Sequence, residues 1–215
     1  MQALLFGAIG TLVETSELQR RAFNAAFAEA NLEWAWNRAT YADLLQTSGG
    51  EKRISEALRR AGLAIDAANI HRRKTELFHE ILAQERPGPR PGVADIVAAA
   101  PSAGVRLGFV TTTSRDNVDA ILGASGIPAD TFDFIGDASM VASPKPAPDI
   151  YNLALARLGA KHAVAIEDSP DGANAARAAG LQVVAFPGVM HVGRDFGDVL
   201  FQTQHLDPSS LLGLL

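Results

Sequence analysis

The sequence contains no cysteine and only four lysines, and it carries no excess of positive charge. Without cysteine the chain can form no disulfide, present no thiol nucleophile and build no thiolate zinc site. No apolar run approaches the ~20 residues of a membrane span, and the opening residues lack the positive flank of a secretory signal. Nineteen basic against twenty-four acidic residues give a net charge of −5, which argues against a general nucleic-acid binder. We therefore expect a cytoplasmic protein that binds neither membranes nor nucleic acid.

The order of hydrophobic patterns predicts an α/β fold with an insertion. Hydrophobic residues make up 47% of the chain, enough for a substantial core. Residues 3–9 form an apolar run typical of a buried strand, and from residue 93 onward helical and strand patterns alternate, as in a parallel sheet. Residues 17–84 show only helical patterns, and a proline- and glycine-rich segment follows them. We predict a Rossmann-like parallel sheet core of residues 1–15 and 87–215, with an α-helical cap domain of residues 16–86 inserted.

Polar and turn residues follow several of the predicted strands. Ligands of an open parallel sheet bind outside the carboxyl ends of its strands. We therefore expect one crevice, covered by the helical insert, where four segments converge: 7–11, 111–114, 143–145 and 167–169.

Each of these segments has a functional and a purely structural interpretation. Thr111 and Thr112, at a helix start, could hold a phosphate through amides and hydroxyls, or their segment could merely cap the helix. Lys145, fixed by flanking prolines, could neutralise phosphate oxygens or pair with a nearby acid. Glu167 and Asp168 suit a magnesium ion, or else an ion pair with Lys145 and a helix cap. The residues alone leave both interpretations open.

Taken together, these motifs resemble the haloacid dehalogenase-like (HAD) superfamily of phosphatases. In that pattern a first strand ends in D-x-D-G-T, a second ends in Thr or Ser, a Lys follows, and a further strand ends in E-D or D-D. The resemblance covers nearly the whole chain and is strongest for the CbbY-type group, whose described activity is dephosphorylation of xylulose bisphosphate. The stretches that carry it are 14–15, 20–24, 49–50, 53–54, 71, 74–75, 111–114, 145–151 and 167–169.

The first motif departs from this pattern, because D-x-D-G-T is here Gly7-Ala8-Ile9-Gly10-Thr11. The resemblance places the nucleophilic aspartate, also a magnesium ligand, at Gly7 and the acid/base aspartate at Ile9. Glycine offers neither nucleophile nor metal ligand, and isoleucine cannot transfer a proton. In a serine protease, losing the covalent nucleophile costs on the order of a million-fold in rate. We therefore expect no catalytic residue at these positions and no ordinary phosphatase turnover.

The resemblance also implies binding residues in the sheet unit. Phosphate binding falls to Thr111, Thr112 and Lys145. Because two acidic groups are missing, magnesium is expected to bind weakly or only alongside a phosphate ligand, through Asp168, Glu167 and the Ile9 backbone carbonyl.

For the insert and its hinge, the resemblance implies substrate contacts at Gly50, Arg53 and Glu14. An exposed helix start would explain Gly50 and Arg53 in structural terms. A solvated helix face shared with neighbouring arginines would explain His71 and Lys74 almost as well as a ligand contact.

Three functions therefore compete. The chain could be a non-catalytic relative that binds a small phosphorylated ligand, acting as a sensor, a regulator or the partner of an active enzyme. It could be a phosphatase with a displaced nucleophile, such as Thr11 or Glu14, or with direct attack by water. It could also be a structural or interaction protein that binds an unknown protein partner.

Overall fold

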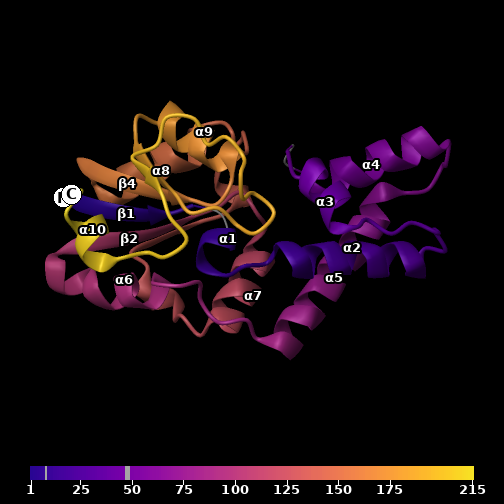
Figure 1. Ribbon diagram of the computed structural model, residues 1–215, viewed down its shortest axis with the longest axis horizontal. Helices are drawn as coiled ribbons and strands as arrows, with labels where there is room; N and C mark the ends of the chain where they lie inside the picture. The colour runs from indigo at the N-terminus through magenta and orange to yellow at the C-terminus, as the bar shows by residue number, and fades with distance from the viewer. Residues whose placement is uncertain (8, 47–48) are drawn as a thin grey trace. The chain divides into compact units, whose positions relative to one another are not determined.

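The computed structural model describes residues 1–7, 9–46 and 49–215, and the chain divides into two compact units (Figure 1). The first unit consists of Met1–Glu14 and Pro87–Leu215, and the second of Thr15–Arg86. The second unit is therefore an insertion between the first strand of the sheet and all the others.

The first unit is built on a six-stranded sheet whose paired strands are all parallel. The strand order is β3-β2-β1-β4-β5-β6, which confirms the predicted Rossmann-like α/β architecture. The strands are β1 (Gln2–Phe6), β2 (Val105–Val110), β3 (Phe134–Gly136), β4 (His162–Glu167), β5 (Gln182–Ala185) and β6 (Phe201–Gln202).

The central strand β1 sets the position of the site. Phe6, its last residue, lies opposite Phe109 of β2 and Ile166 of β4. The carboxyl ends of the three central strands therefore lie at the same edge of the sheet, and the residues that follow each strand come close together there.

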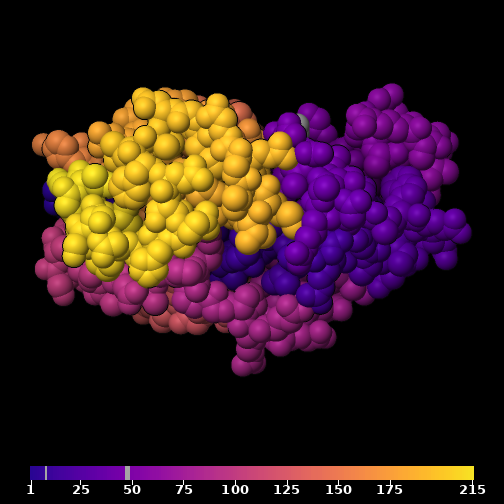
Figure 2. Space-filling view, viewed as in Figure 1, coloured from indigo at the N-terminus to yellow at the C-terminus, as the bar shows by residue number. Residues whose placement is uncertain are grey.

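Helices cover both faces of the sheet, α8 and α9 on one side and α6 and α7 on the other (Figure 1). Side chains alternate along a strand, so Ala3 and Leu5 of β1 share the face that packs against apolar residues of α8 and α9. The helices of this unit are α1 (Ile9–Leu12), α6 (Val93–Ala99), α7 (Arg115–Ser125), α8 (Asp149–Leu158), α9 (Pro170–Ala178) and α10 (Pro208–Leu212). In the space-filling view, the chain after β5 forms much of the visible face of this unit (Figure 2).

The second unit contains four helices among its described residues: α2 (Ser16–Glu29), α3 (Arg38–Leu44), α4 (Gly50–Ala61) and α5 (Ala67–Glu85). It has an aromatic core of its own, in which Trp36 lies 4.7 Å from Phe27 and 5.0 Å from Phe23 between ring centroids. Within the described parts of the chain, no helix is both long enough and apolar enough to cross a membrane.

Some sequence expectations differ from the structure. The first strand was expected to continue to Ile9, but it ends at Phe6, and Ile9 begins the short helix α1. Neither β6 nor α10 was predicted. Parts of two predicted features, a helix ending at Thr47 and a break at Ser48, lie outside the described residues, as does Ala8 of the first motif.

Candidate functional site

A buried ion pair lies at the carboxyl edge of the sheet. The Lys145 ammonium is 2.6 Å from Oε1 of Glu167, and it also donates to the carbonyl of Val110 at 2.9 Å. The Tyr151 hydroxyl donates to the same Glu167 oxygen and lies 3.3 Å from the ammonium. Burial and the Glu167 carboxylate raise the pKa of the Tyr151 hydroxyl well above its usual value, so this hydroxyl remains a donor. The structural interpretation of Lys145, pairing with an acid, is therefore realised.

The Glu167 carboxylate fills the space beside Gly7. A β-carbon on Gly7 would lie 2.7 Å from Oε2 of Glu167 and still closer to Oε1 and Cδ. A β-carbon on Gly172 of α9 would also overlap this carboxylate. Glu167 thus sits between two glycines, and the position where the resemblance expects a nucleophile has room for a side chain only if Glu167 moves.

Asp168 occupies a similar space beside Gly10. A β-carbon on Gly10 would lie 2.9 Å from Cγ of Asp168 and closer still to Oδ2. Burial, and then repulsion by the Glu167 carboxylate, raise the pKa of the Asp168 carboxyl to about 7, against the opposing positive charges of Arg90 and Lys145. The two neighbouring carboxylates are therefore held close together in a site that penalises their combined negative charge.

The donor set for a cation consists of two acidic side chains. Oε2 of Glu167 and Oδ1 of Asp168 are buried and have no hydrogen-bond partner among the described residues. Such oxygens suit a hard cation such as Mg²⁺. The Ile9 carbonyl already accepts the helical bond from the amide of Val13 at 3.1 Å. In the described ranges, no group of three or more His, Asp and Glu side chains could hold a metal ion, so these residues fit magnesium only with water or phosphate as further ligands.

The threonine segment after β2 is partly occupied by its own hydrogen bonds. The amide of Thr111 pairs with the Gly136 carbonyl at 3.3 Å, so the expectation that this amide is available to an anion is wrong. The Thr111 hydroxyl accepts from the amide of Thr113 at 3.2 Å. Ser114 caps α7, which realises the structural interpretation for one of the four residues. Thr112 has no hydrogen-bond partner within the part of the chain that the structure describes, and it remains a donor for a ligand.

Arg90 also belongs to this edge of the sheet, and the sequence analysis did not single it out. Its buried guanidinium donates to the carbonyls of Gly10 at 2.9 Å, Phe186 at 2.7 Å and Pro187 at 2.7 Å. Glu14, expected to contact a substrate, accepts instead from the Val189 amide at 2.8 Å in this structure.

In the helical unit, the expected ligand residues gather around the start of α4. A β-carbon on Gly50 would lie 2.6 Å from Nε2 of His71, so only glycine allows the half-buried imidazole to lie here. Arg53 donates from Nε to the carbonyl of Leu44 at 2.8 Å. Arg53 also lines a cavity of about 790 Å³ whose wall includes Trp34 and Trp36.

Lys74 lies in the core of the helical unit, so of the two interpretations left open by the sequence the solvated face is wrong for this residue. Its side chain is 5% exposed, its ammonium donates to Oε1 of Gln19, and it lies 4.7 Å from the Phe23 ring centroid. Burial, and to a lesser extent the charge of Arg53, lower the pKa of the Lys74 ammonium to about 7. Burial and the charge of Lys74 also lower the pKa of His71.

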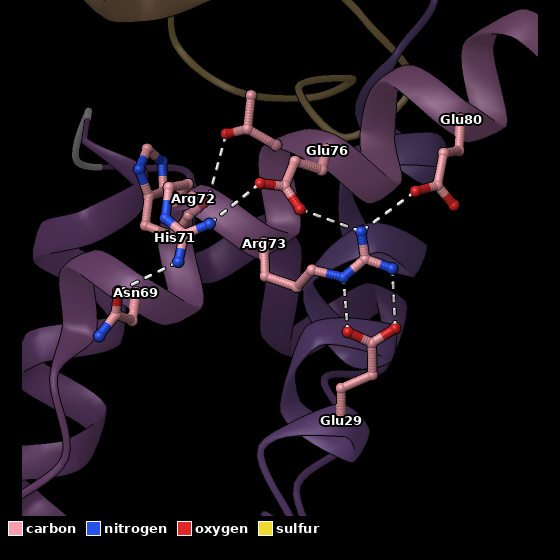
Figure 3. Close-up of polar contacts among 8 residues, drawn as sticks. Glu29, Asn69, His71, Arg72, Arg73, Glu76 and Glu80 are labelled. Atoms are coloured by element: carbon pink, nitrogen blue, oxygen red, sulfur yellow. Dashed lines mark hydrogen bonds and ion pairs between the residues drawn. The ribbon is translucent and has the colours of Figure 1, made fainter.

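Arg73 reaches into a network of carboxylates, and Arg72 bonds to Glu76 and to the amide oxygen of Asn69 (Figure 3). Arg73 donates to both oxygens of Glu29 on α2, at 2.6 and 3.0 Å, and to Glu76 and Glu80, each at 3.1 Å. Arg73 therefore joins α2 to α5 at the surface, whereas Arg72 bonds to Glu76 and Asn69 of its own helix. The solvated-face interpretation holds for these two arginines but not for Lys74.

Comparison with known proteins agrees with this geometry. A family model described as haloacid dehalogenase-like hydrolase matches residues 1–180. Protein CbbY of Cereibacter sphaeroides is 47% identical over 195 residues, which cover 87% of this chain and 85% of that protein. The chain belongs to the haloacid dehalogenase-like hydrolase family.

Solved structures in the haloacid dehalogenase-like family show which relatives share the whole fold. Two crystal structures of CbbY from Rhodobacter sphaeroides each match with a TM-score of 0.86 and 44% identity, over 94% of this chain and 93% of theirs. One is a point mutant in complex with xylulose-(1,5)bisphosphate, and the other is in complex with phosphate. These ligands are properties of the relative.

The structure brings together some of the residues expected from the haloacid dehalogenase-like pattern and adds others. Lys145 and Glu167 meet directly, and the space beside Gly7 is filled by Glu167. Two residues to which the sequence analysis gave no role, Arg90 and Tyr151, also lie at this edge of the sheet. Tyr151 follows Lys145 by six residues, so it was within reach of the sequence, whereas Arg90 stands alone among prolines and glycines, where no periodicity indicates its direction.

Proposed function

We propose that this chain binds phosphate or a phosphorylated sugar at the carboxyl edge of its sheet and does not turn it over as a phosphatase. Its membership of the family and its likeness to CbbY support the ligand class, because CbbY is the relative seen with xylulose-(1,5)bisphosphate and with phosphate. The ligand-binding groups we assign are Thr112, the hydroxyl of Thr111 and the ammonium of Lys145.

The observation that carries the proposal is the environment of Gly7. A nucleophilic carboxylate is absent there by sequence, and the nearest carboxylate, Glu167, is fully buried and bound to Lys145 and Tyr151. A buried carboxylate that neutralises an ammonium is a poor nucleophile, because leaving the pair would cost several kcal/mol. The alternative nucleophile Thr11 is buried, and its hydroxyl donates to the Gly7 carbonyl at 3.2 Å.

Magnesium, on this proposal, is an accessory rather than a resident group. Asp168 and Glu167 would hold it, with phosphate or water completing the shell, and the ion would supply charge neutralisation for phosphate oxygens. Because Lys145 already neutralises Glu167, we expect magnesium to bind mainly in the presence of a phosphate ligand.

The experiment is calorimetry with inorganic phosphate and xylulose-1,5-bisphosphate, each with and without magnesium. We expect binding of at least one ligand and a weaker signal for Thr112→Val, while Thr203→Val, a threonine on the β6 side of the sheet, leaves affinity unchanged. Heat of binding absent for both ligands overturns the proposal and favours a structural or interaction protein.

A turnover assay tests the second half of the proposal. Wild-type protein should release phosphate from xylulose-1,5-bisphosphate no faster than the buffer. The pair Gly7→Asp with Ile9→Asp should gain activity if Glu167 moves aside for the new side chain and the rest of the pocket accepts substrate. Rapid turnover by the wild-type chain, lost in Asp168→Ala, would show instead that it is an active phosphatase with a displaced nucleophile.

A further inference from the structure

Arg90 makes an unusually complete set of contacts for a residue outside any helix or strand. It lies in the segment that returns from the helical unit, and its side chain is 7% exposed. Three backbone carbonyls accept from its guanidinium, which also stacks on the Phe186 ring at 3.5 Å from the centroid. The backbone amide of Arg90 donates to the Leu12 carbonyl at 2.8 Å. A planar guanidinium with several fixed donors can join separate segments in a way that a lysine cannot.

The accepting carbonyls belong to the two segments that border the acidic pair. Gly10 lies in the short helix α1 after β1, against Asp168, while Phe186 and Pro187 follow β5. The loop after β5 is in turn bonded to the acidic pair, since the amide of Phe186 donates to the Glu167 carbonyl at 2.7 Å. Arg90 therefore closes a ring of contacts around Glu167 and Asp168.

Charge points to the same role. Burial of the guanidinium lowers the pKa of Arg90, and the carboxylates of Asp168 and Glu14 oppose this shift by favouring the charged form. With Gly7 lacking an acid, Arg90 and Lys145 supply positive charge to opposite members of the acidic pair.

The loop after β5 also contacts the segment where the chain first leaves the sheet unit for the helical unit. Glu14 is the last residue of the sheet unit before that crossing, and it accepts from the Val189 amide in this loop. Arg90 follows the second crossing at Arg86–Pro87 by a few residues. Both crossings are thus tied within the sheet unit to one loop, residues 186–189.

We propose that Arg90 is a positioning residue for the anion site, holding helix α1 and the 186–189 loop against the acidic pair so that the ligand-binding groups keep their geometry. The inference rests on the proposed function for its ligand, and on the contacts above for the positioning itself. Arg90 does not touch the ligand; it acts through Gly10, Phe186 and Pro187.

The test compares Arg90→Met with Arg177→Met in the full chain. Arg177 is a matched control because it is also a partly buried arginine of the sheet unit that donates to backbone carbonyls, those of Phe196 and Asp198. Among the described residues it contacts none of the groups at the anion site. Both variants should lower the melting temperature.

Two further measurements separate positioning from general stability. In Arg90→Met, hydrogen exchange should rise in both segments, 7–13 and 186–190, and the affinity for inorganic phosphate should fall by about tenfold to a hundredfold, the usual cost of losing a group that orients ligand-binding residues. Arg177→Met should leave both readouts at wild-type values. Arg90→Lys, which keeps the charge without the planar fork, should recover only part of the affinity.

The inference is overturned if Arg90→Met and Arg177→Met change phosphate affinity and hydrogen exchange equally. It is also overturned if Arg90→Met leaves hydrogen exchange unchanged in both segments. If wild-type protein binds no phosphate compound, the proposed function fails, and the exchange comparison alone then decides whether Arg90 positions these segments.

Discussion

Replacing Gly7 by alanine should destabilise the sheet unit strongly, even though alanine adds only one carbon. The backbone at Gly7 is not left-handed, so alanine fits its dihedral angles, and the effect comes from the collision with the Glu167 carboxylate. To make room, Glu167 has to leave Lys145 and Tyr151. Breaking a buried ion pair costs about 3–5 kcal/mol. For a chain of this size that corresponds to a fall in melting temperature of roughly 6–20 °C.

Thermal unfolding of the Gly7→Ala variant can be followed separately in the two units, because both tryptophans lie in one of them. Trp34 and Trp36 both lie in the helical unit, so their fluorescence reports that unit, whereas far-UV circular dichroism reports both. Gly7→Ala should shift the dichroism transition more than the fluorescence transition. Gly123→Ala is the control, because it lies inside α7 with open space around its β-carbon and should stabilise by about 0.5–1 kcal/mol.

A double-mutant cycle with Glu167→Ala assigns the cause. In that background the carboxylate is gone, and Gly7→Ala should cost less than about 1 kcal/mol, giving a coupling of several kcal/mol between the two positions. A wild-type-like Gly7→Ala variant, or a large cost that persists without the Glu167 carboxylate, would refute the reasoning that this side chain fills the space at position 7.

Three further outcomes follow from the remaining geometry. The folded-state pKa of Lys74 is about 7 and its usual value is 10.5, so between about pH 7 and 10.5 the unfolded chain binds more protons than the folded one. The free energy of unfolding, followed by tryptophan fluorescence in urea, should therefore rise with pH over this interval. Lys74→Met should remove that rise and stabilise the helical unit at neutral pH. Arg73→Ala should lower stability slightly in low salt and less in high salt, since its partners, Glu29 among them, are exposed. Urea titrations at two salt concentrations measure the difference. Ser114→Ala should lower stability by about 1 kcal/mol through loss of the α7 cap, measured by dichroism against Ser55→Ala in α4.

The parallel sheet was predictable because alternating strand and helix patterns leave few topologies open. The end of β1 was not, since an apolar run without alternation reads the same in a buried strand and in a short buried helix. Ile9 was therefore predicted in the strand, although it belongs to α1. The edge strand β6, two exposed residues long, carries no periodicity at all.

The burial of Lys74 could have been predicted from the sequence, and the solvated-face interpretation of this residue was wrong. It stands next to Arg72 and Arg73, and a run of three cations suggests one charged face. Successive helical residues are about 100° apart, however, and Lys74 shares its face with residues four positions away. Those residues, Ile70 and Phe78, are buried apolar side chains, which is the signal that places Lys74 in the core.

The details of the proposed anion site depend on tertiary contacts that no local pattern encodes. The sequence allowed Lys145 either a phosphate or an acidic partner, and only the structure shows which group is 2.6 Å away. Glu167 can lie beside Gly7 because Gly7, which follows β1 and is far away in the sequence, has no β-carbon. The direction of the Arg90 side chain is equally non-local, since its three carbonyl partners come from Gly10, Phe186 and Pro187.

The place of β1 at the centre of the sheet has a consequence for biosynthesis. Gln2 pairs with Val105 and His162, so after β1 is synthesised roughly a hundred further residues follow before either neighbouring strand exists. At about 5–20 residues per second, this interval lasts many seconds, during which an apolar strand remains unpaired. The helical unit, whose residues are consecutive, is complete before β2 begins, and nascent chains should gain its tryptophan burial before the sheet forms.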